Sequence, residues 1–300
     1  MRAAEGVARS TRTMLKTVSR LAAAVLALLL FACSAQTVIH ERVSPERSII
    51  VTEDSRGLRT LLFERGGARQ SVVKPGDPDH IELPYARTVL IGLALIEEPR
   101  RVLIVGLGGG TLPGFLRKHY PQAVIDVVDI DPDVVEVAKK LFGFREDDRM
   151  RVHVADGRRF IEAVREPFYD LIILDAFGAD SIPTHLTTME FLRSVRRAVM
   201  PQGLVVANVW GQPLNRLYDA MVRTYQEVFD DVYILDVSGN VNKILFALPR
   251  KQAISQAELA RQARSLSAAG RFRFDLGEAV NYGFMQLREK NREAPVLRDH

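Results

Sequence analysis

Short apolar runs alternate with amphipathic helical patterns through the middle of the chain. Each run is of strand length and shows little polar alternation, which indicates strands buried on both faces. Helices are expected in the segments between the runs, so the pattern predicts a doubly wound, mostly parallel α/β sheet covered on both faces. The runs are VLIVG, AVIDVVDID, RVHVAD, YDLIILDAF and LVVANVW, and the expected helices span 112–119, 132–142, 158 onward, 188–199 and 215–229.

The series ends differently. Residues 231–249, DVYILDVSGNVNKILFALP, read as two strands joined through Gly239 and Asn240. No room remains for a crossover helix, so the last strand must run antiparallel. A sheet closed in this way is typical of S-adenosylmethionine-dependent enzymes, whereas nicotinamide dehydrogenases usually lack it. Residues 252–269 are expected to be helical and the remainder irregular.

The segment before the glycine-rich turn has another pattern. Residues 48–73 contain short β-rich runs between glycine-containing turns, which predicts a small antiparallel hairpin or meander. A helix is expected over 83–96. These patterns divide the chain into a leader (1–32), a β-rich segment with a helix (33–97), a Rossmann-like nucleoside-binding domain (98–250) and a C-terminal helix and tail (251–300).

Charge is concentrated at the N-terminus. The chain has 300 residues and a net charge of +4, with 41 basic and 37 acidic side chains. Residues 1–32 hold five basic and one acidic residue, so the other 268 carry 36 of each sign. The body is therefore neutral, and nothing in its charge favours nucleic-acid binding.

The leader resembles an export signal. A basic stretch precedes an apolar run from Leu21 to Phe31, and the only cysteine follows in Leu30-Phe31-Ala32-Cys33, which resembles a lipobox. A start at Met14 would give a compact signal. We expect an exported lipoprotein anchored to a membrane of the cell envelope, with an uncleaved N-terminal anchor as the alternative and a cytoplasmic protein if the leader is not used. One cysteine excludes an internal disulfide.

A strand that feeds a glycine-rich turn is the first candidate for chemistry. Val102 to Gly106 form the strand, and Gly108, Gly109 and Gly110 follow before a helix expected from Thr111. Missing side chains let a backbone approach a ligand, and a helix N-terminus favours anions. The turn predicts a nucleotide-like ligand.

Each central strand ends in a carboxylate, at the sheet edge where ligands bind in this fold class. Asp129 is placed to bind a ribose diol, while Asp131 supports the turn and caps the next helix. Asp156, followed by Gly157, is expected either to bind an adenine amino group or to cap a helix. Asp175 is expected to hold a substrate amine or take its proton, with a pKa raised by burial, or to be a structural acid.

The remaining polar residues give weaker signals. Asp180 is interpreted as a turn residue or a second acid. Tyr85, Trp210 and His185 fall near expected loop ends, and His185 is interpreted as a surface residue. No histidine and cysteine cluster suggests a metal, so no metal site is expected.

Together these segments resemble the spermidine synthase family of aminopropyltransferases over residues 48–249. The matching segments are VLIVGLGGG, VVDIDPDVVEVAKKLF, RVHVADGRRFI, YDLIILDAF and IPTHLTTMEFL. The resemblance implies that decarboxylated S-adenosylmethionine, or the methylthioadenosine left after transfer, binds to the glycine turn, Asp129, Asp156 and Gly157. It also implies that Asp175 accepts the proton of the attacking amine and that Pro183 lies near the adenine.

The sequence departs from the family pattern on the amine side. The acid of the family's GGGDG turn falls on Gly109, and the second acid of its Asp-x-x-Asp loop falls on Gly178. Its Tyr-His-Glu or Tyr-Gln-Glu segment survives as Tyr85, which with Asp180 is a candidate for binding the amine. Amine recognition relies on charge-assisted hydrogen bonds to carboxylates.

Three hypotheses follow. The first is a divergent aminopropyltransferase acting on an amine such as putrescine. The second is a methyltransferase that uses ordinary S-adenosylmethionine, and the third is a protein that binds a nucleoside or polyamine without catalysis. A small amine and, through the leader, a membrane are the expected partners, and a homodimer is left open.

Overall fold

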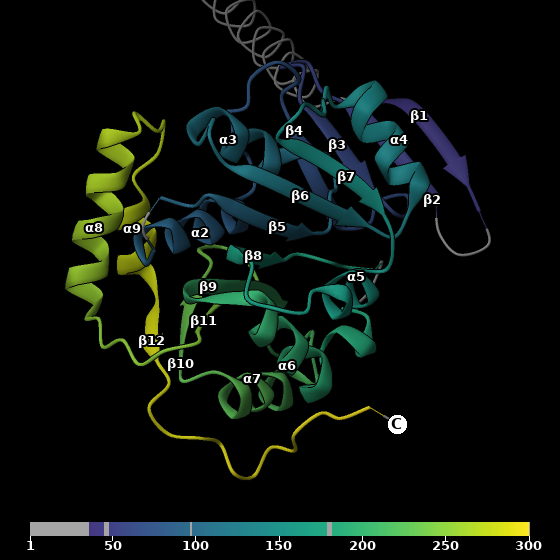
Figure 1. Cartoon of the computed structure of the whole chain (residues 1–300). Helices are drawn as coiled ribbons and strands as arrows, with labels where there is room; N and C mark the ends of the chain where they lie inside the picture. The colour runs from purple at the N-terminus through teal and green to yellow at the C-terminus, as the bar shows by residue number, and fades with distance from the viewer. Residues whose placement is uncertain (1–35, 45–47, 97, 179–181, 300) are drawn as a thin grey trace, which may run out of the picture.

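A computed structural model describes residues 36–44, 48–96, 98–178 and 182–299 of the chain. Its main element is an eight-stranded sheet with the order β12-β10-β11-β9-β8-β5-β6-β7 (Figure 1). The strands are β5 (Arg101–Val105), β6 (Val124–Asp129), β7 (Met150–Val154), β8 (Tyr169–Leu174), β9 (Val199–Trp210), β10 (Asp231–Asp236), β11 (Asn242–Leu248) and β12 (Phe284–Gln286).

The directions of the strands confirm the predicted fold class. Strands β5 to β9 pair in parallel, and β11 lies antiparallel between β9 and β10. The order of the strands reverses at β5, because the chain moves outward to β6 and β7 and then returns to β8 on the other side of β5. Ligands bind beyond the carboxyl ends of the strands at such a point.

Helices cover both faces of this sheet, as the uninterrupted apolar strands predicted. They are α2 (Pro84–Leu90), continued by a 3₁₀ turn (Ile91–Ala94), then α3 (Thr111–His119), α4 (Pro132–Leu141), α5 (Gly157–Ala163), α6 (Met189–Ala198), α7 (Tyr218–Val228), α8 (Gln256–Ala269) and α9 (Leu276–Tyr282), with a second 3₁₀ turn at Thr184–Leu186.

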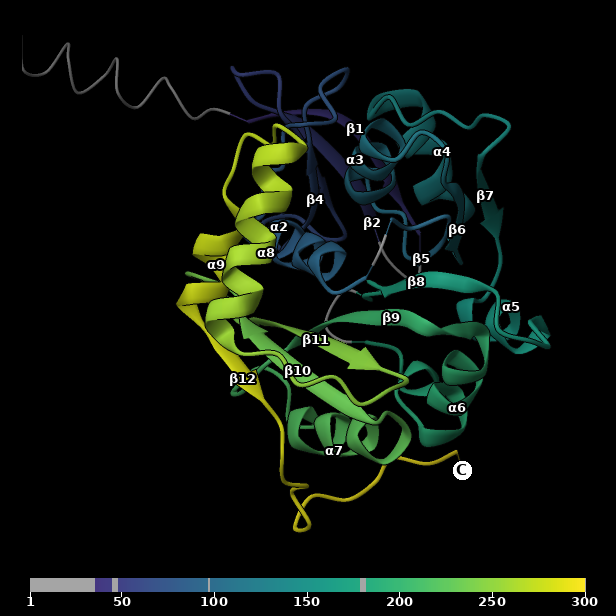
Figure 2. The same ribbon diagram turned by 60° about the vertical axis from the view of Figure 1, so that its left-hand side comes forward.

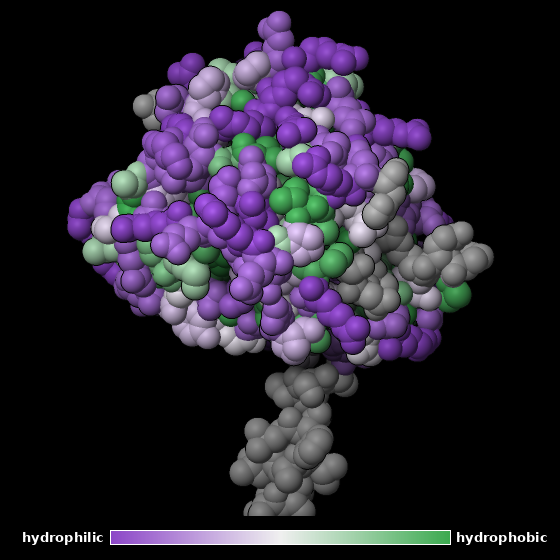
Figure 3. Space-filling model, turned by 90° about the horizontal axis from the view of Figure 1, so that it is seen from below, coloured by the Kyte–Doolittle hydropathy of each residue, from purple (hydrophilic) through white to green (hydrophobic). Residues whose placement is uncertain are grey.

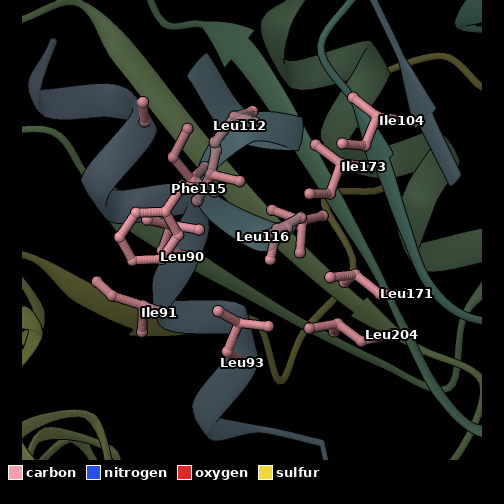
Figure 4. Packing of buried hydrophobic residues seen from close by; sticks show 14 of the residues in the cluster. Leu90, Ile91, Leu93, Ile104, Leu112, Phe115, Leu116, Leu171, Ile173 and Leu204 are labelled. Atoms are coloured by element: carbon pink, nitrogen blue, oxygen red, sulfur yellow. The ribbon is translucent and has the colours of Figure 1, made fainter. Parts of the chain in front are cut away.

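Alternate residues of the central strand supply two separate cores. Val102 and Ile104 of β5 contribute to the core under α2, α3, α8 and α9, whereas Leu103 and Val105 contribute to the core under α5, α6 and α7. Figure 4 shows the first core, where Ile104 lies among side chains from α2, α3 and neighbouring strands. Both faces of β5 are thus buried, which fixes the position of the turn that follows it.

A second, four-stranded antiparallel sheet precedes the main one. Its strands occur in chain order: β1 (Thr37–Val43), β2 (Ser48–Glu53), β3 (Arg59–Leu62) and β4 (Arg69–Val73). Apolar residues of β2 and β3 pack against Val134 and Val137 of α4. The sheet therefore lies over the same edge of the main sheet to which the strand-end carboxylates point.

Several predicted boundaries need correction, among them the start of α7 at Tyr218 rather than residue 215 and the start of β9 at Val199 rather than residue 204. The helix expected over 83–96 ends as α-helix at Leu90, and α8 begins at Gln256 rather than at residue 252. Residues 270–300 are not wholly irregular, because α9 forms and β12 adds to the sheet edge beside β10. Strand β12 has three residues, too few to show an alternating pattern in the sequence, and it forms because it pairs with β10. Strand β1, outside the predicted meander, is likewise formed by pairing with β2.

The C-terminal segment crosses the helical face instead of leaving the molecule (Figure 2). The Leu297 amide donates to Thr224 Oγ1 of α7 at 3.0 Å, and the Leu297 carbonyl accepts from the Met189 amide at the start of α6. Arg158 of α5 donates to Asp299 Oδ1 at 2.7 Å and to the His185 carbonyl at 3.2 Å. The last residues of the chain are therefore linked to the loop around His185.

The surface of the described residues is mainly polar. Figure 3 shows polar side chains over most of the face seen from below, with apolar residues exposed in small groups between them. Within residues 36–299, apart from the short gaps, no helix has the length and apolar character needed to cross a membrane. The leader and Cys33 lie outside the described residues.

Replacing a core leucine tests this packing. Leu116 of α3 is 0% exposed, so Leu116→Ala should lower the free energy of unfolding by about 2 to 5 kcal/mol. Leu217, which is 42% exposed, provides the matched control, and Leu217→Ala should change stability by less than about 1 kcal/mol. Denaturant unfolding measures both, and equal losses would show that the assignment of this core is wrong.

Candidate active site

A cavity of about 400 Å³ opens where the carboxyl ends of β5, β6, β8 and β9 meet the small sheet. Its lining includes the glycine turn, the strand-end carboxylates and the loop after β8. Most of the predicted site residues line it: Tyr85, Gly106, Gly108, Asp129, Asp156, Gly157, Asp175 and Pro183. The structure thus brings together residues that lie up to a hundred positions apart in the sequence.

The glycine turn lies against the end of β8. The Asp175 amide donates to the Val105 carbonyl at 2.8 Å, and the Gly106 amide donates to the Val128 carbonyl at 2.8 Å. Gly106 has a φ of 104°, and a β-carbon there would collide with the Asp175 carbonyl oxygen. Only glycine fits this position, because any side chain would separate the turn from β8.

Gly109 lies in the turn but does not line the cavity formed by the described residues. A β-carbon at this position would point at Val73 Cγ2 (2.8 Å), Phe142 Cδ1 (2.9 Å) and Ser71 Oγ (3.0 Å). The direction in which an acidic side chain would leave the backbone is therefore filled. In this chain, side chains of β4 and of the C-terminal end of α4 occupy the space that an acid at position 109 would need.

Asp129 connects the end of β6 to the glycine turn. Its Oδ2 accepts from the Leu107 amide at 2.9 Å, and its Oδ1 accepts from the Asp131 amide at 2.9 Å. Asp131 caps α4 by accepting from the Asp133 amide at 2.8 Å, the role predicted for it. Asp129 is therefore held rigidly beside the turn and lines the cavity, where a carboxylate suits hydroxyl donors.

Asp156 has the helix-capping role and also lines the cavity. Its Oδ1 accepts from the Arg159 amide at 2.9 Å, and its Oδ2 lies 2.9 Å from Nε2 of His185. Burial raises the pKa of Asp156, but the hydrogen bonds from the Arg159 amide and His185 outweigh burial and hold the pKa below its usual value. His185 is exposed, with 45% of its side chain accessible, as expected from the sequence, and it also lines the cavity.

Asp175 is enclosed by two hydrogen-bond donors. Asn208 Nδ2 donates to Oδ1 at 2.8 Å, and the Tyr85 hydroxyl donates to Oδ2 at 3.1 Å. Burial raises the pKa of Asp175 to about 6, even though both hydrogen bonds act to lower it. Burial together with the Asp175 charge also raises the pKa of Tyr85 well above its usual value, so Tyr85 stays a donor. A carboxylate with this pKa suits proton transfer near neutral pH.

Two buried asparagines, Asn208 and Asn242, also belong to the site, although neither is predicted from the sequence. Asn242 Nδ2 donates to Asn208 Oδ1 at 2.7 Å, and both side chains line the cavity while being only 7% and 4% exposed. Asn208 interrupts the apolar run LVVANVW, which is the signal that could have revealed it, because buried polar side chains need hydrogen-bond partners. Asn242 begins β11 directly before Lys243 and gives no such signal. Phe177 and Trp210, whose rings are 5.5 Å apart, complete this wall.

The loop after β8 is described only in part. Gly178 lines the cavity without contributing a carboxylate. Pro183, which follows residues 179–181, also lines it. Asp180, a candidate for amine binding, lies outside the described residues. Among the residues that are described, no group of three or more histidine, cysteine, aspartate or glutamate side chains could hold a metal ion.

Comparison with known proteins places these residues in a family. The sequence profile of the spermine/spermidine synthase domain matches residues 85–237. The polyamine aminopropyltransferase of Vibrio vulnificus is 37% identical over 249 residues, which cover 80% of this chain and 81% of that protein.

Two solved structures share the fold. A probable spermidine synthase from Corynebacterium glutamicum superposes with a TM-score of 0.68 at 20% identity and covers 88% of this chain and 97% of that chain. Human methyltransferase-like protein 13, solved in complex with SAH, gives a TM-score of 0.59 at 33% identity and covers 63% of this chain and 93% of that chain.

The filled space beside Gly109 can be tested by adding a single methyl group. Gly109→Ala should destabilise the protein by about 1 to 3 kcal/mol, because the added β-carbon overpacks against Val73 and Phe142. Gly114→Ala in α3 is the matched control, since its β-carbon would meet only Pro78 Cβ at 3.9 Å and alanine favours the helix. A thermal melt in which Gly109→Ala is as stable as Gly114→Ala would contradict the proposed crowding.

Proposed function

The chain belongs to the spermine/spermidine synthase family, and we propose that it transfers an aminopropyl group from decarboxylated S-adenosylmethionine to an amine such as putrescine. The observation that carries this proposal is the position of Asp175. Its carboxylate lies at the end of β8 beside the glycine turn, faces the cavity and has a pKa raised by burial to about 6.

The proposed reaction is a single displacement. The amine nitrogen attacks the aminopropyl carbon attached to the sulfonium, a C–N bond forms and the C–S bond breaks. The electron pair of the broken bond stays on sulfur and leaves neutral methylthioadenosine, while Asp175 accepts the proton of the attacking amine. Above pH 6 Asp175 is mostly ionised, and donation from Tyr85 and Asn208 keeps both of its oxygens oriented.

We propose that the rest of the cavity binds the nucleoside. Asp129 accepts hydrogen bonds from the ribose hydroxyls, and the glycine turn lies along the adenosyl group through Gly106 and Gly108. Gly109, expected from the sequence to bind it too, does not line the cavity formed by the described residues. Asp156, Gly157 and Pro183 border the adenine. Support comes from the strand-end geometry, since Asp129 and Asp156 close adjacent parallel strands and face one cavity. Tyr85 and Asp180 are proposed to contact the amine, without a metal.

A methyltransferase that uses ordinary S-adenosylmethionine is the second candidate. Two observations favour it: the space beside Gly109 has no room for an amine-binding acid, and a relative of the same fold at 33% identity was solved with SAH. A protein that only binds the nucleoside or a polyamine is the third candidate. We rank aminopropyl transfer first, because the 37% identical relative, which aligns with four fifths of this chain, is named for aminopropyl transfer.

For localisation we propose export, with Cys33 lipidated and the domain anchored to a membrane of the cell envelope. The support is the basic and apolar leader that ends at the only cysteine. A cytoplasmic protein is the alternative. We keep a homodimer as a possible assembly.

A turnover assay separates the three functions. The protein from Ser34 onward is incubated with putrescine and either decarboxylated or ordinary S-adenosylmethionine, and the products are identified by mass spectrometry. Methylthioadenosine and spermidine formed only from the decarboxylated donor would support aminopropyl transfer. S-adenosylhomocysteine formed from the ordinary donor would support the methyltransferase instead, and tight binding without turnover would support the third hypothesis.

Removing the proposed ribose ligand should weaken binding. Asp129→Ala should weaken methylthioadenosine binding by about 1 to 3 kcal/mol, measured by titration calorimetry, because hydrogen bonds to a charged acceptor are lost. Asp126→Ala on the same strand is the control, since Asp126 bonds His153 and Tyr169 away from the cavity and should leave affinity unchanged. Equal affinities for Asp129→Ala and wild type would place the nucleoside elsewhere.

Replacing the proposed base should separate binding from turnover. Asp175→Asn should keep methylthioadenosine affinity within about threefold and lower kcat by about a hundredfold or more, since it removes the proton acceptor. In the wild type, kcat/KM should fall as the pH drops below about 6, because protonated Asp175 cannot accept the proton. Retained turnover in Asp175→Asn would exclude Asp175 as the base.

A further inference from the structure

A chain of hydrogen bonds runs from β11 to Asp175. Asn242 on β11 is paired with Trp210, two residues after Asn208 on β9, so both asparagines lie on the same face of the antiparallel pair. Asn242 Nδ2 donates to Asn208 Oδ1 at 2.7 Å, and Asn208 Nδ2 donates to Asp175 Oδ1 at 2.8 Å. The three side chains therefore form one continuous line along the cavity wall.

The direction of this chain follows from the chemistry of its members. An ionised carboxylate only accepts hydrogen bonds, so Asn208 must turn its NH₂ group toward Asp175 when Asp175 is ionised. The amide oxygen of Asn208 then points the other way, into a site that is 4% exposed and needs a donor. Asn242 supplies that donor.

The opposite orientation of Asn208 would favour the opposite state of Asp175. Turned by 180°, the Asn208 oxygen would face the carboxylate, and the two acceptors would repel each other unless Asp175 were protonated. With Nδ2 of Asn242 toward Asn208, as in this structure, residue 242 opposes that orientation, because its N–H would then face the N–H of Asn208. Residue 242 thus influences Asp175 through Asn208, without contacting it.

Few charged groups compete with this effect. Around Asp175, α2 contributes Tyr85, which donates to Oδ2, and β9 contributes Asn208. Among the described residues, the other titratable or charged ones that line the cavity are Arg69 on β4, Asp129 on β6, Asp156 and His185, whereas the side-chain hydrogen bonds to Asp175 come from Asn208 and Tyr85. The protonation state of Asp175 therefore depends on burial and on its two donors.

We propose that Asn242 is a positioning residue for the base: it fixes the amide of Asn208 with the nitrogen toward Asp175 and so keeps Asp175 ready to accept a proton. This inference rests on the proposed role of Asp175 as the base. The contact is made by a residue of the C-terminal antiparallel hairpin, which gives that hairpin a part in the chemistry of the parallel sheet.

The test reverses the polarity of residue 242. In Asn242→Asp the new carboxylate accepts from Asn208, which must turn its nitrogen away from Asp175. Asn242→Leu removes the donor with a side chain of similar volume. Asn240→Asp, on the same hairpin and also lining the cavity, is the control for added charge. The protonation of Asp175 is followed in the unliganded protein by infrared spectroscopy, with the band assigned by its loss in Asp175→Asn.

We expect the titration midpoint of Asp175 to rise by about one pH unit or more in Asn242→Asp, clearly more than in Asn240→Asp, and to rise by a smaller amount in Asn242→Leu. The acidic limb of kcat/KM with decarboxylated S-adenosylmethionine and putrescine should move by the same amount, with kcat restored at high pH. Should Asn242→Asp fail to fold, a midpoint in Asn242→Leu that does not rise above that of the wild type overturns the positioning role.

Two failures can be told apart. If the wild type does not turn over but the Asp175 midpoint shifts as expected, the proposed function fails and the positioning role stands. If the wild type turns over and the midpoint moves no more in Asn242→Asp than in Asn240→Asp, the positioning role is overturned. Lower thermal stability of the Asn242 variants with an unchanged midpoint would show that Asn242 is only structural.

Discussion

The close contact between the glycine turn and the end of β8 determines the rest of the site. The backbone of residues 105 and 106 runs directly against Asp175, a contact that only a glycine at 106 permits. Both faces of β5 are buried in separate cores, so the turn cannot shift away from β8. As a result, a carboxylate is enclosed by protein at the point where the strand order reverses and where ligands of such sheets bind.

The electrostatic character of the cavity follows from how its carboxylates are used. Asp129 and Asp156 are held in place by backbone amides, and for Asp156 the hydrogen bonds from the Arg159 amide and His185 also lower its pKa. Asp175 receives its hydrogen bonds from side chains and lies where burial raises its pKa to about 6. The surroundings of the three carboxylates thus suit them to different roles. Asp129 and Asp156 are suited to holding hydroxyl or amino groups, and Asp175 is suited to exchanging a proton.

The sequence predicted what depends on local pattern and missed what depends on long-range contacts. The parallel sheet, its antiparallel closing hairpin and the Asp131 cap follow from periodicity and local chemistry, and they are present. Strand β12 and the docking of Leu297 on Thr224 depend on partners distant in the chain. Asn208 stands out as a polar residue inside an apolar run, but Asn242 begins its strand, and only the strand register shows that the two meet. The roles predicted for the ligand-binding residues stay predictions, although the structure places most of them around one cavity.

The most direct test of this account is a crystal structure of the protein with methylthioadenosine. We expect the ribose hydroxyls to lie on Asp129, the adenine to lie between Asp156 and Pro183, and the sulfur to lie beside Gly106, within reach of an amine held by Asp175. A nucleoside bound in another place, or in this cavity with its sulfur pointing away from Asp175, would contradict the proposed use of the glycine turn and of Asp175 as the base.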